Sequence, residues 1–204
     1  VLPQIDKPAG YSIRLAGAFE DQQESFGKLG MLGALILILV YIVMASQFES
    51  FSNPGIIMFT VPFALSGVIL ALWITGVSLD MIGALGIVLL VGIVVKNGIV
   101  LVDYINLMRE RGHDLNEAIQ ISGQSRMRPV LMTAFTTILG MVPMAVSQGE
   151  GAEMWRPLGI VVIGGLTVAT FLTLYIVPVI YGAMSKKGER DKIKKVRENF
   201  IFMD

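Results

Sequence analysis

The chain has 204 residues, of which 54% are hydrophobic and 16% are charged, and its 16 basic residues balance its 16 acidic ones. The charged fraction lies far below the roughly 25% of soluble domains, which argues against a soluble or disordered protein, and a net charge of zero provides no basic field for nucleic acid. The absence of cysteine excludes disulfides, thiolate catalysis and cysteine-based metal sites, and the single histidine, His113, excludes sites built on several histidines.

Residues 1–28 form a polar opening segment. The chain starts with Val1 and shows no signal-peptide pattern, so we expect it to be a piece of a longer protein. Residues 11–15 alternate weakly between apolar and polar side chains, which predicts a short strand. Residues 20–28 predict a helix that leads into the first apolar stretch.

Five stretches with almost no charge follow along the chain. Each reaches the roughly 20 residues that a helix needs to cross a hydrocarbon core of about 30 Å. None shows the alternation over about 10 residues that is typical of a membrane β-barrel. We therefore predict an all-α membrane protein with five transmembrane helices, at about residues 29–46, 54–75, 80–102, 129–148 and 157–182.

Prolines lie at several of the expected helix boundaries. The first turn of a helix does not use its N–H groups, so proline is tolerated there, and we expect spans to begin at Pro54, Pro129 and Pro157. Inside a helix, proline removes a hydrogen bond and predicts a kink. Kinks are therefore expected at Pro62, Pro143 and Pro178.

The segments between and after the spans are short. Gly76 predicts a turn, and either Ser78 or Asp80 can cap the third span. Residues 103–128 predict a polar loop that contains an amphipathic helix over residues 114–124. Residues 186–204 form a basic tail, which we expect to bind the surface of anionic membrane lipid.

The distribution of lysine and arginine predicts the orientation in the membrane. If residues 1–28 lie outside, the cytoplasmic segments hold 11 of the 16 basic residues and the external segments hold 4. The positive-inside rule then makes the N-terminus extracytoplasmic and the C-terminus cytoplasmic. In this orientation Trp73 and Trp155 both lie near the outer interface, where tryptophan is favoured.

Lys96 is the one ionisable residue deep inside a predicted span. It lies about 9 Å from the end of the span at Val102, so a snorkelling lysine is one interpretation. Gly92, one turn earlier, leaves room for a neighbouring helix, and Asn97 and Thr133 lie at a similar depth, which indicates a polar patch between helices. Apart from Asp80 at the very start of the third span, no predicted span contains Asp or Glu, so we expect the counter-charge to come from elsewhere.

Several motifs occur in order along the chain. They are MASQFESF at 44–51, VSLDMIG at 77–83, GIVVKNGIVLVD at 92–103 and RMRPVLMT at 126–133. Over about residues 1–185 the chain resembles the C-terminal transmembrane half of resistance–nodulation–division (RND) multidrug efflux pumps of the hydrophobe/amphiphile type.

The resemblance implies a multi-pass transporter of the bacterial inner membrane that exchanges protons for drugs or other amphiphiles. Residues 1–28 would be the end of an extracytoplasmic α+β porter domain. The implied assembly is a homotrimer with a periplasmic adaptor protein and an outer-membrane channel. No cofactor is implied beyond the coupling ion, H⁺.

The resemblance also implies a proton relay. Lys96 would pair with two aspartates of the missing half, and Arg126 and Thr133 would join the same region, with Asn97 adjacent. Other interpretations stay open: Arg126 and Arg128 also fit ordinary topology determinants, and Thr133 also fits a threonine that bonds its own backbone.

Rival functions follow from the same sequence. An RND-type exporter of lipid or protein would share this membrane half, and a non-transporting membrane scaffold would make Lys96 dispensable. An intramembrane enzyme is disfavoured, because the spans hold no histidine and no acid beyond Asp80 at the start of the third span. An ATP-driven transporter is disfavoured because the chain lacks a GxxxxGK[ST] motif.

Overall fold

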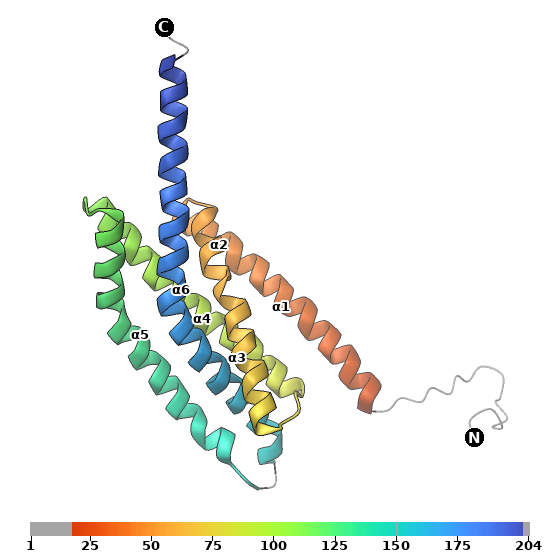
Figure 1. The fold of residues 1–204 in the computed structure, drawn as a ribbon. Coiled ribbons are helices and arrows are strands. Elements are labelled where there is room, and N and C mark those ends of the chain that lie inside the picture. Colours follow the sequence, from red (N-terminus) through yellow and green to blue (C-terminus); the bar gives the residue numbers. More distant parts are fainter. Residues whose placement is uncertain (1–17, 150, 202–204) are drawn as a thin grey trace, which may run out of the picture.

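A computed structural model describes the backbone of residues 18–149 and 151–201 and the side chains of residues 23–149 and 151–185. This part of the chain is helical and contains no strand (Figure 1). The helices are α1 (Ala18–Phe48), α2 (Ser52–Met58), α3 (Thr60–Thr75), α4 (Met81–Glu110), α5 (Leu115–Val146) and α6 (Ala152–Ile201). The strand expected at residues 11–15 lies outside the described residues.

Five long apolar helices match the five predicted spans, with α2 and α3 together forming the second. The prediction of an all-helical fold with five apolar helices long enough to cross a membrane is thereby confirmed for the described residues. The helix expected at residues 20–28 is the beginning of α1.

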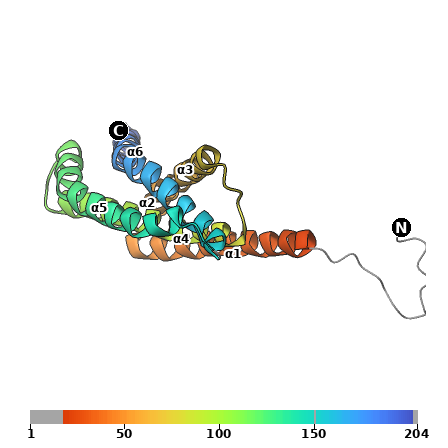
Figure 2. The ribbon, with the colours of Figure 1, turned by 90° about the horizontal axis from the view of Figure 1, so that it is seen from below.

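The helices pack in two layers. α6 contacts α2, α3, α4 and α5, whereas α1 contacts only α2 and α4. Figure 2 shows α1, α4 and α5 side by side in one layer, with α3 and α6 in the other. α4 therefore lies between α1 and α5, and one face of α4 is turned away from α6.

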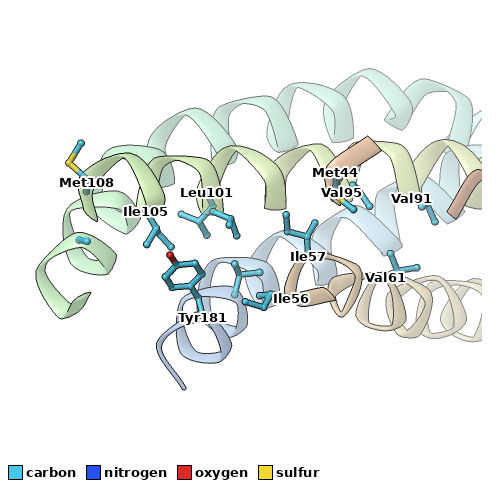
Figure 3. Close-up of a cluster of buried hydrophobic side chains, with 13 residues drawn as sticks. Met44, Ile56, Ile57, Val61, Val91, Val95, Leu101, Ile105, Met108 and Tyr181 are labelled. Atoms are coloured by element: carbon cyan, nitrogen blue, oxygen red, sulfur yellow. The ribbon is translucent and has the colours of Figure 1, made fainter. Parts of the chain in front are cut away.

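Two clusters of buried side chains fill the space between the layers. The larger one surrounds α4 and includes Ile57, Leu101, Ile105 and Tyr181 (Figure 3). The smaller cluster lies where α3, α4, α5 and α6 meet, and its members are Ala64, Val68, Leu90, Val94, Ala134, Val161, Leu166 and Ala169. α1 contributes little, since Met44 is the only buried side chain among residues 23–48.

Glycines allow the closest helix contacts. A Cβ placed on Gly67 of α3 would lie 2.7 Å from the carbonyl oxygen of Gly164 in α6, so these backbones touch. In α4, a Cβ on Gly98 would lie 2.9 Å from Cγ2 of Ile57. Gly92 differs, because no atom lies within 4 Å of its added Cβ.

Two predicted helix starts are wrong. Pro129 lies inside α5 and Pro157 lies inside α6. α5 begins earlier because its first turns are held by packing: Ala118 and Ser122 are fully buried. The carbonyl that loses its partner to Pro129 belongs to Ser125, which is exposed and can bond water instead.

The polar loop expected at residues 103–128 is consequently mostly helical. α4 continues to Glu110, and residues 111–114 alone connect it to α5. The predicted amphipathic helix exists as the first part of α5 rather than as a separate element.

The remaining boundary chemistry follows the expectation. Asp80 caps α4, since its Oδ1 accepts a hydrogen bond of 2.6 Å from the Gly83 N–H. Gly76 ends α3 with φ +64°. The second span is interrupted at Phe59, close to Pro62, whose ring nitrogen cannot donate to the Met58 carbonyl.

Candidate functional site

Lys96 lies on the face of α4 that the rest of the bundle leaves open. Val94 and Val95 are buried, whereas Lys96 directly after them is exposed and Asn97 is half-buried. The lysine is thus not part of the packed interior of this chain. It lies on a ridge between two grooves.

The first groove lies between α4 and α5 and has a volume of about 500 Å³. Lys96, Asn97 and Thr133 all line it, so three of the predicted site residues come together. Its other lining residues are Ile93, Val100, Pro129, Val130, Met132, Thr136 and Thr137.

Three threonines give this groove a polar wall. The hydroxyl groups of Thr133, Thr136 and Thr137 donate to backbone carbonyls of α5, at 3.0, 2.8 and 2.9 Å respectively. Their protons are therefore used within the helix, and their lone pairs are left to accept. Thr136 and Thr137 were not predicted from the sequence, although residues three and four positions after Thr133 share its helix face.

The second groove lies between α1 and α4 and has a volume of about 330 Å³. Lys96 is its only charged lining residue, and the walls are otherwise apolar side chains and Gly92. The room that Gly92 was expected to leave is therefore present and open on this side of Lys96.

No carboxylate lines either groove. Lys28 and Glu24 form an ion pair elsewhere, at 2.8 Å, and His113 Nδ1 lies 3.2 Å from a Glu117 carboxylate oxygen. Within the described residues no group of three or more histidine or acidic side chains could hold a metal ion. The ammonium group of Lys96 thus has no counter-charge in the described part of the chain.

Arg126 does not line the groove. Its guanidinium carbon lies 4.4 Å from the centre of the Tyr104 ring on α4, in a cation–π contact. Arg128 and Asp103 are exposed. The structure therefore places Arg126 at the contact between α4 and α5, apart from Lys96, Asn97 and Thr133.

A pair of polar contacts that the sequence analysis missed ties α4 to α6. The Tyr181 hydroxyl donates to Asn106 Oδ1 at 2.5 Å, and Arg109 Nη1 donates to Ser185 Oγ at 2.9 Å. The two partners of each contact lie more than 70 positions apart in sequence, so no local sequence pattern predicts these contacts.

Comparison with known proteins gives consistent matches. The sequence profile of the AcrB/AcrD/AcrF family matches residues 1–185. The chain is 42% identical over 187 residues to the cobalt-zinc-cadmium resistance protein CzcA of Cupriavidus metallidurans. It is 36% identical over 186 residues to the swarming motility protein SwrC of Bacillus subtilis. Each alignment covers 91% of this chain and 18% of the relative, so the chain spans less than a fifth of their length.

Solved structures match in the same region. Two crystal forms of a heavy metal efflux pump, form II and form I, superpose with TM-scores of 0.76 and 0.74 at 34% and 36% identity. They cover 88% and 83% of this chain, which corresponds to 18% and 17% of the pump chains.

Proposed function

The chain belongs to the AcrB/AcrD/AcrF family of RND efflux transporters, and from this premise we propose that it carries the lysine half of a transmembrane proton relay. The complete transporter would be a proton antiporter of the bacterial inner membrane. The observation that carries the proposal is the position of Lys96: exposed on the open face of a membrane bundle, with no acid in the grooves on either side.

The energetics favour a partner for Lys96. Even the mildest measures put the cost of a charged side chain at the bilayer centre at about 2.5–3.5 kcal/mol. Carboxylates on a helix of the missing half, seated against the face between α1 and α5, would offset that cost when they are ionised. Two open grooves beside one lysine provide room for side chains of such a helix.

The proposed cycle is a charge switch. Ionised aspartates pair with Lys96, and protonation of the aspartates from outside breaks this ion pair. Asn97 and the threonine lone pairs then offer neutral hydrogen-bond partners to the released ammonium or to water. A change of this kind biases a two-state arrangement of helices, which would drive the extracytoplasmic domains.

Arg126 lies at a distance from the proposed ion pair of Lys96. It precedes Thr133 by two turns of α5, or about 10 Å, and its ring contact fixes it between α4 and α5. A fixed positive charge there would act on the cytoplasmic exit path of the proton rather than on the ion pair itself.

The test is Lys96→Ala in the complete transporter, purified and reconstituted in proteoliposomes. Breaking a buried ion pair costs about 3–5 kcal/mol, which corresponds to at least about a hundredfold in an equilibrium, so proton-coupled export should fall by that order. Lys28→Ala is the matched control, since Lys28 is exposed and pairs only with Glu24 four residues earlier. Normal proton flux in Lys96→Ala would instead support a scaffold.

The cargo we propose first is a drug or another amphiphile. A second candidate is a heavy-metal cation, because CzcA and the superposed pumps are named for metals. Deleting the complete gene and measuring growth in cobalt, zinc or cadmium salts against growth in amphiphilic dyes separates the two. Sensitivity to metals alone would overturn the amphiphile assignment.

The proposed assembly is a homotrimer that works with a periplasmic adaptor protein and an outer-membrane channel. In it, residues 1–28 lie on the extracytoplasmic side and the basic tail lies in the cytoplasm. Family membership and the distribution of basic residues support this arrangement.

A further inference from the structure

A third groove, away from Lys96, lies at the end of the bundle where α3 and α5 end and α6 begins. Its volume is about 370 Å³. Arg156, Ile160 and Ile163 of α6 line it together with Ala71 and Thr75 of α3 and Val146 of α5. We call it the Arg156 groove. Its lining is apolar apart from Thr75, Gln148 and Arg156.

Half-buried Arg156 presents one unpaired donor atom at this groove. Its Nε atom is buried and makes no hydrogen bond within the described part of the chain. The ion pairs among the described residues leave Arg156 out. A buried charged donor without an acceptor is costly, so the geometry calls for an anion or a strong acceptor beside it.

Two tryptophans place the mouth of the groove at a membrane interface. Trp73 is 80% exposed and Trp155 is 53% exposed, and each lies within two residues of a lining residue. Exposed tryptophan is enriched at the level of lipid headgroups. The guanidinium of Arg156 therefore lies near the depth of lipid phosphates.

The apolar part of the groove runs from that level into the bilayer. Arg156, Ile160 and Gly164 follow one another at four-residue intervals on one face of α6. The face spans about 12 Å along the helix axis. This length suits part of an acyl chain.

We propose that the Arg156 groove binds a glycerophospholipid, with its phosphate on the Arg156 guanidinium and one acyl chain along α6 between α3 and α5. Phosphate matches the planar donor geometry of arginine. A lipid without a phosphate group, such as diacylglycerol, would leave the guanidinium unpaired. Free phosphate would leave the apolar wall of the groove uncovered. The proposal requires only that the helices span a membrane, so it does not depend on the proton relay.

Native mass spectrometry of the complete, delipidated transporter tests the site. Phosphatidylethanolamine, diacylglycerol with the same acyl chains, and inorganic phosphate are titrated separately. A hydrogen bond to a charged group is worth enough that Arg156→Gln should weaken binding of the phospholipid roughly tenfold to a hundredfold. Arg111→Gln, an exposed arginine in the turn between α4 and α5, should leave it unchanged.

A second variant keeps the test independent of the arginine. Val146 is 65% exposed, so Val146→Trp fills the groove without entering the core, and we expect it to lower phospholipid binding while the melting temperature stays that of wild type. Equal phospholipid binding by wild type and both variants overturns the proposal. Displacement of the lipid by inorganic phosphate, or equal binding of diacylglycerol, overturns it as well.

Discussion

Lys96 and Asn97 follow the buried pair Val94 and Val95, so one turn of α4 presents both an apolar and a polar face. Depth along the sequence was enough to predict that Thr133 shares a level with them, and the three residues do line one groove. Their role in a relay stays a prediction. The ring contact of Arg126 could not be predicted, because it depends on how α4 and α5 pack.

The Arg126 contact can be tested at Tyr104. Cation–π contacts contribute about 0.5–2 kcal/mol, depending on how far they are desolvated, so Tyr104→Leu should lower the free energy of unfolding of the complete transporter by about that amount. Tyr104→Phe keeps the ring and should stay close to wild type. Denaturation in detergent measures both. Equal losses in the two variants would mean that the hydroxyl group matters and the ring does not.

At the scale of elements, absence of charge predicted the five spans but not their ends. A helix tolerates proline both in its first turn and, at some cost, at an interior position. Pro129 and Pro157 therefore could not show how far upstream their helices start. The buried residues Ala118 and Ser122 hold the early part of α5, and that information is tertiary. The chain has 22 glycines, which favour close packing of membrane helices, but the sequence does not show which of them make the contacts.

Gly164 and Gly140 form a matched pair for testing this packing. A Cβ on Gly164 would overlap the Cβ of Ala71, whereas a Cβ on Gly140 has nothing within 4 Å. Overpacking costs about 1–3 kcal/mol, so we expect Gly164→Ala to destabilise the complete transporter by that amount. Gly140→Ala should be neutral or stabilising by up to about 1 kcal/mol, because alanine is the better helix former. Thermal unfolding of the two variants tests this expectation. Similar unfolding midpoints in Gly164→Ala and Gly140→Ala would refute the close contact between α3 and α6.

At the scale of the whole molecule, the bundle is open where a larger protein would continue. α1 buries one described side chain, and the relatives are more than five times as long as the region that matches. The resemblance in the motifs implies two aspartates that pair with Lys96, and the spans do not contain them. Orientation in the membrane remains a prediction from charge alone.

Cysteine labelling tests the orientation, and the chain has no cysteine of its own to interfere. Ser78→Cys and Asn116→Cys place exposed thiols at opposite ends of the bundle. With the other cysteines of the complete transporter replaced, an impermeant maleimide added to intact cells should label position 78 and spare position 116. Labelling of position 116 alone would show that the orientation is reversed.

The central claim is that Lys96 meets a carboxylate from the part of the transporter that this chain lacks. A cryo-electron microscopy structure of the complete transporter measures the distance from Lys96 Nζ to the nearest carboxylate oxygen. We predict a distance of about 4 Å or less in at least one state of the cycle, as ion pairing requires. A structure in which lipid covers Lys96 and no carboxylate comes near it in any state would contradict the relay.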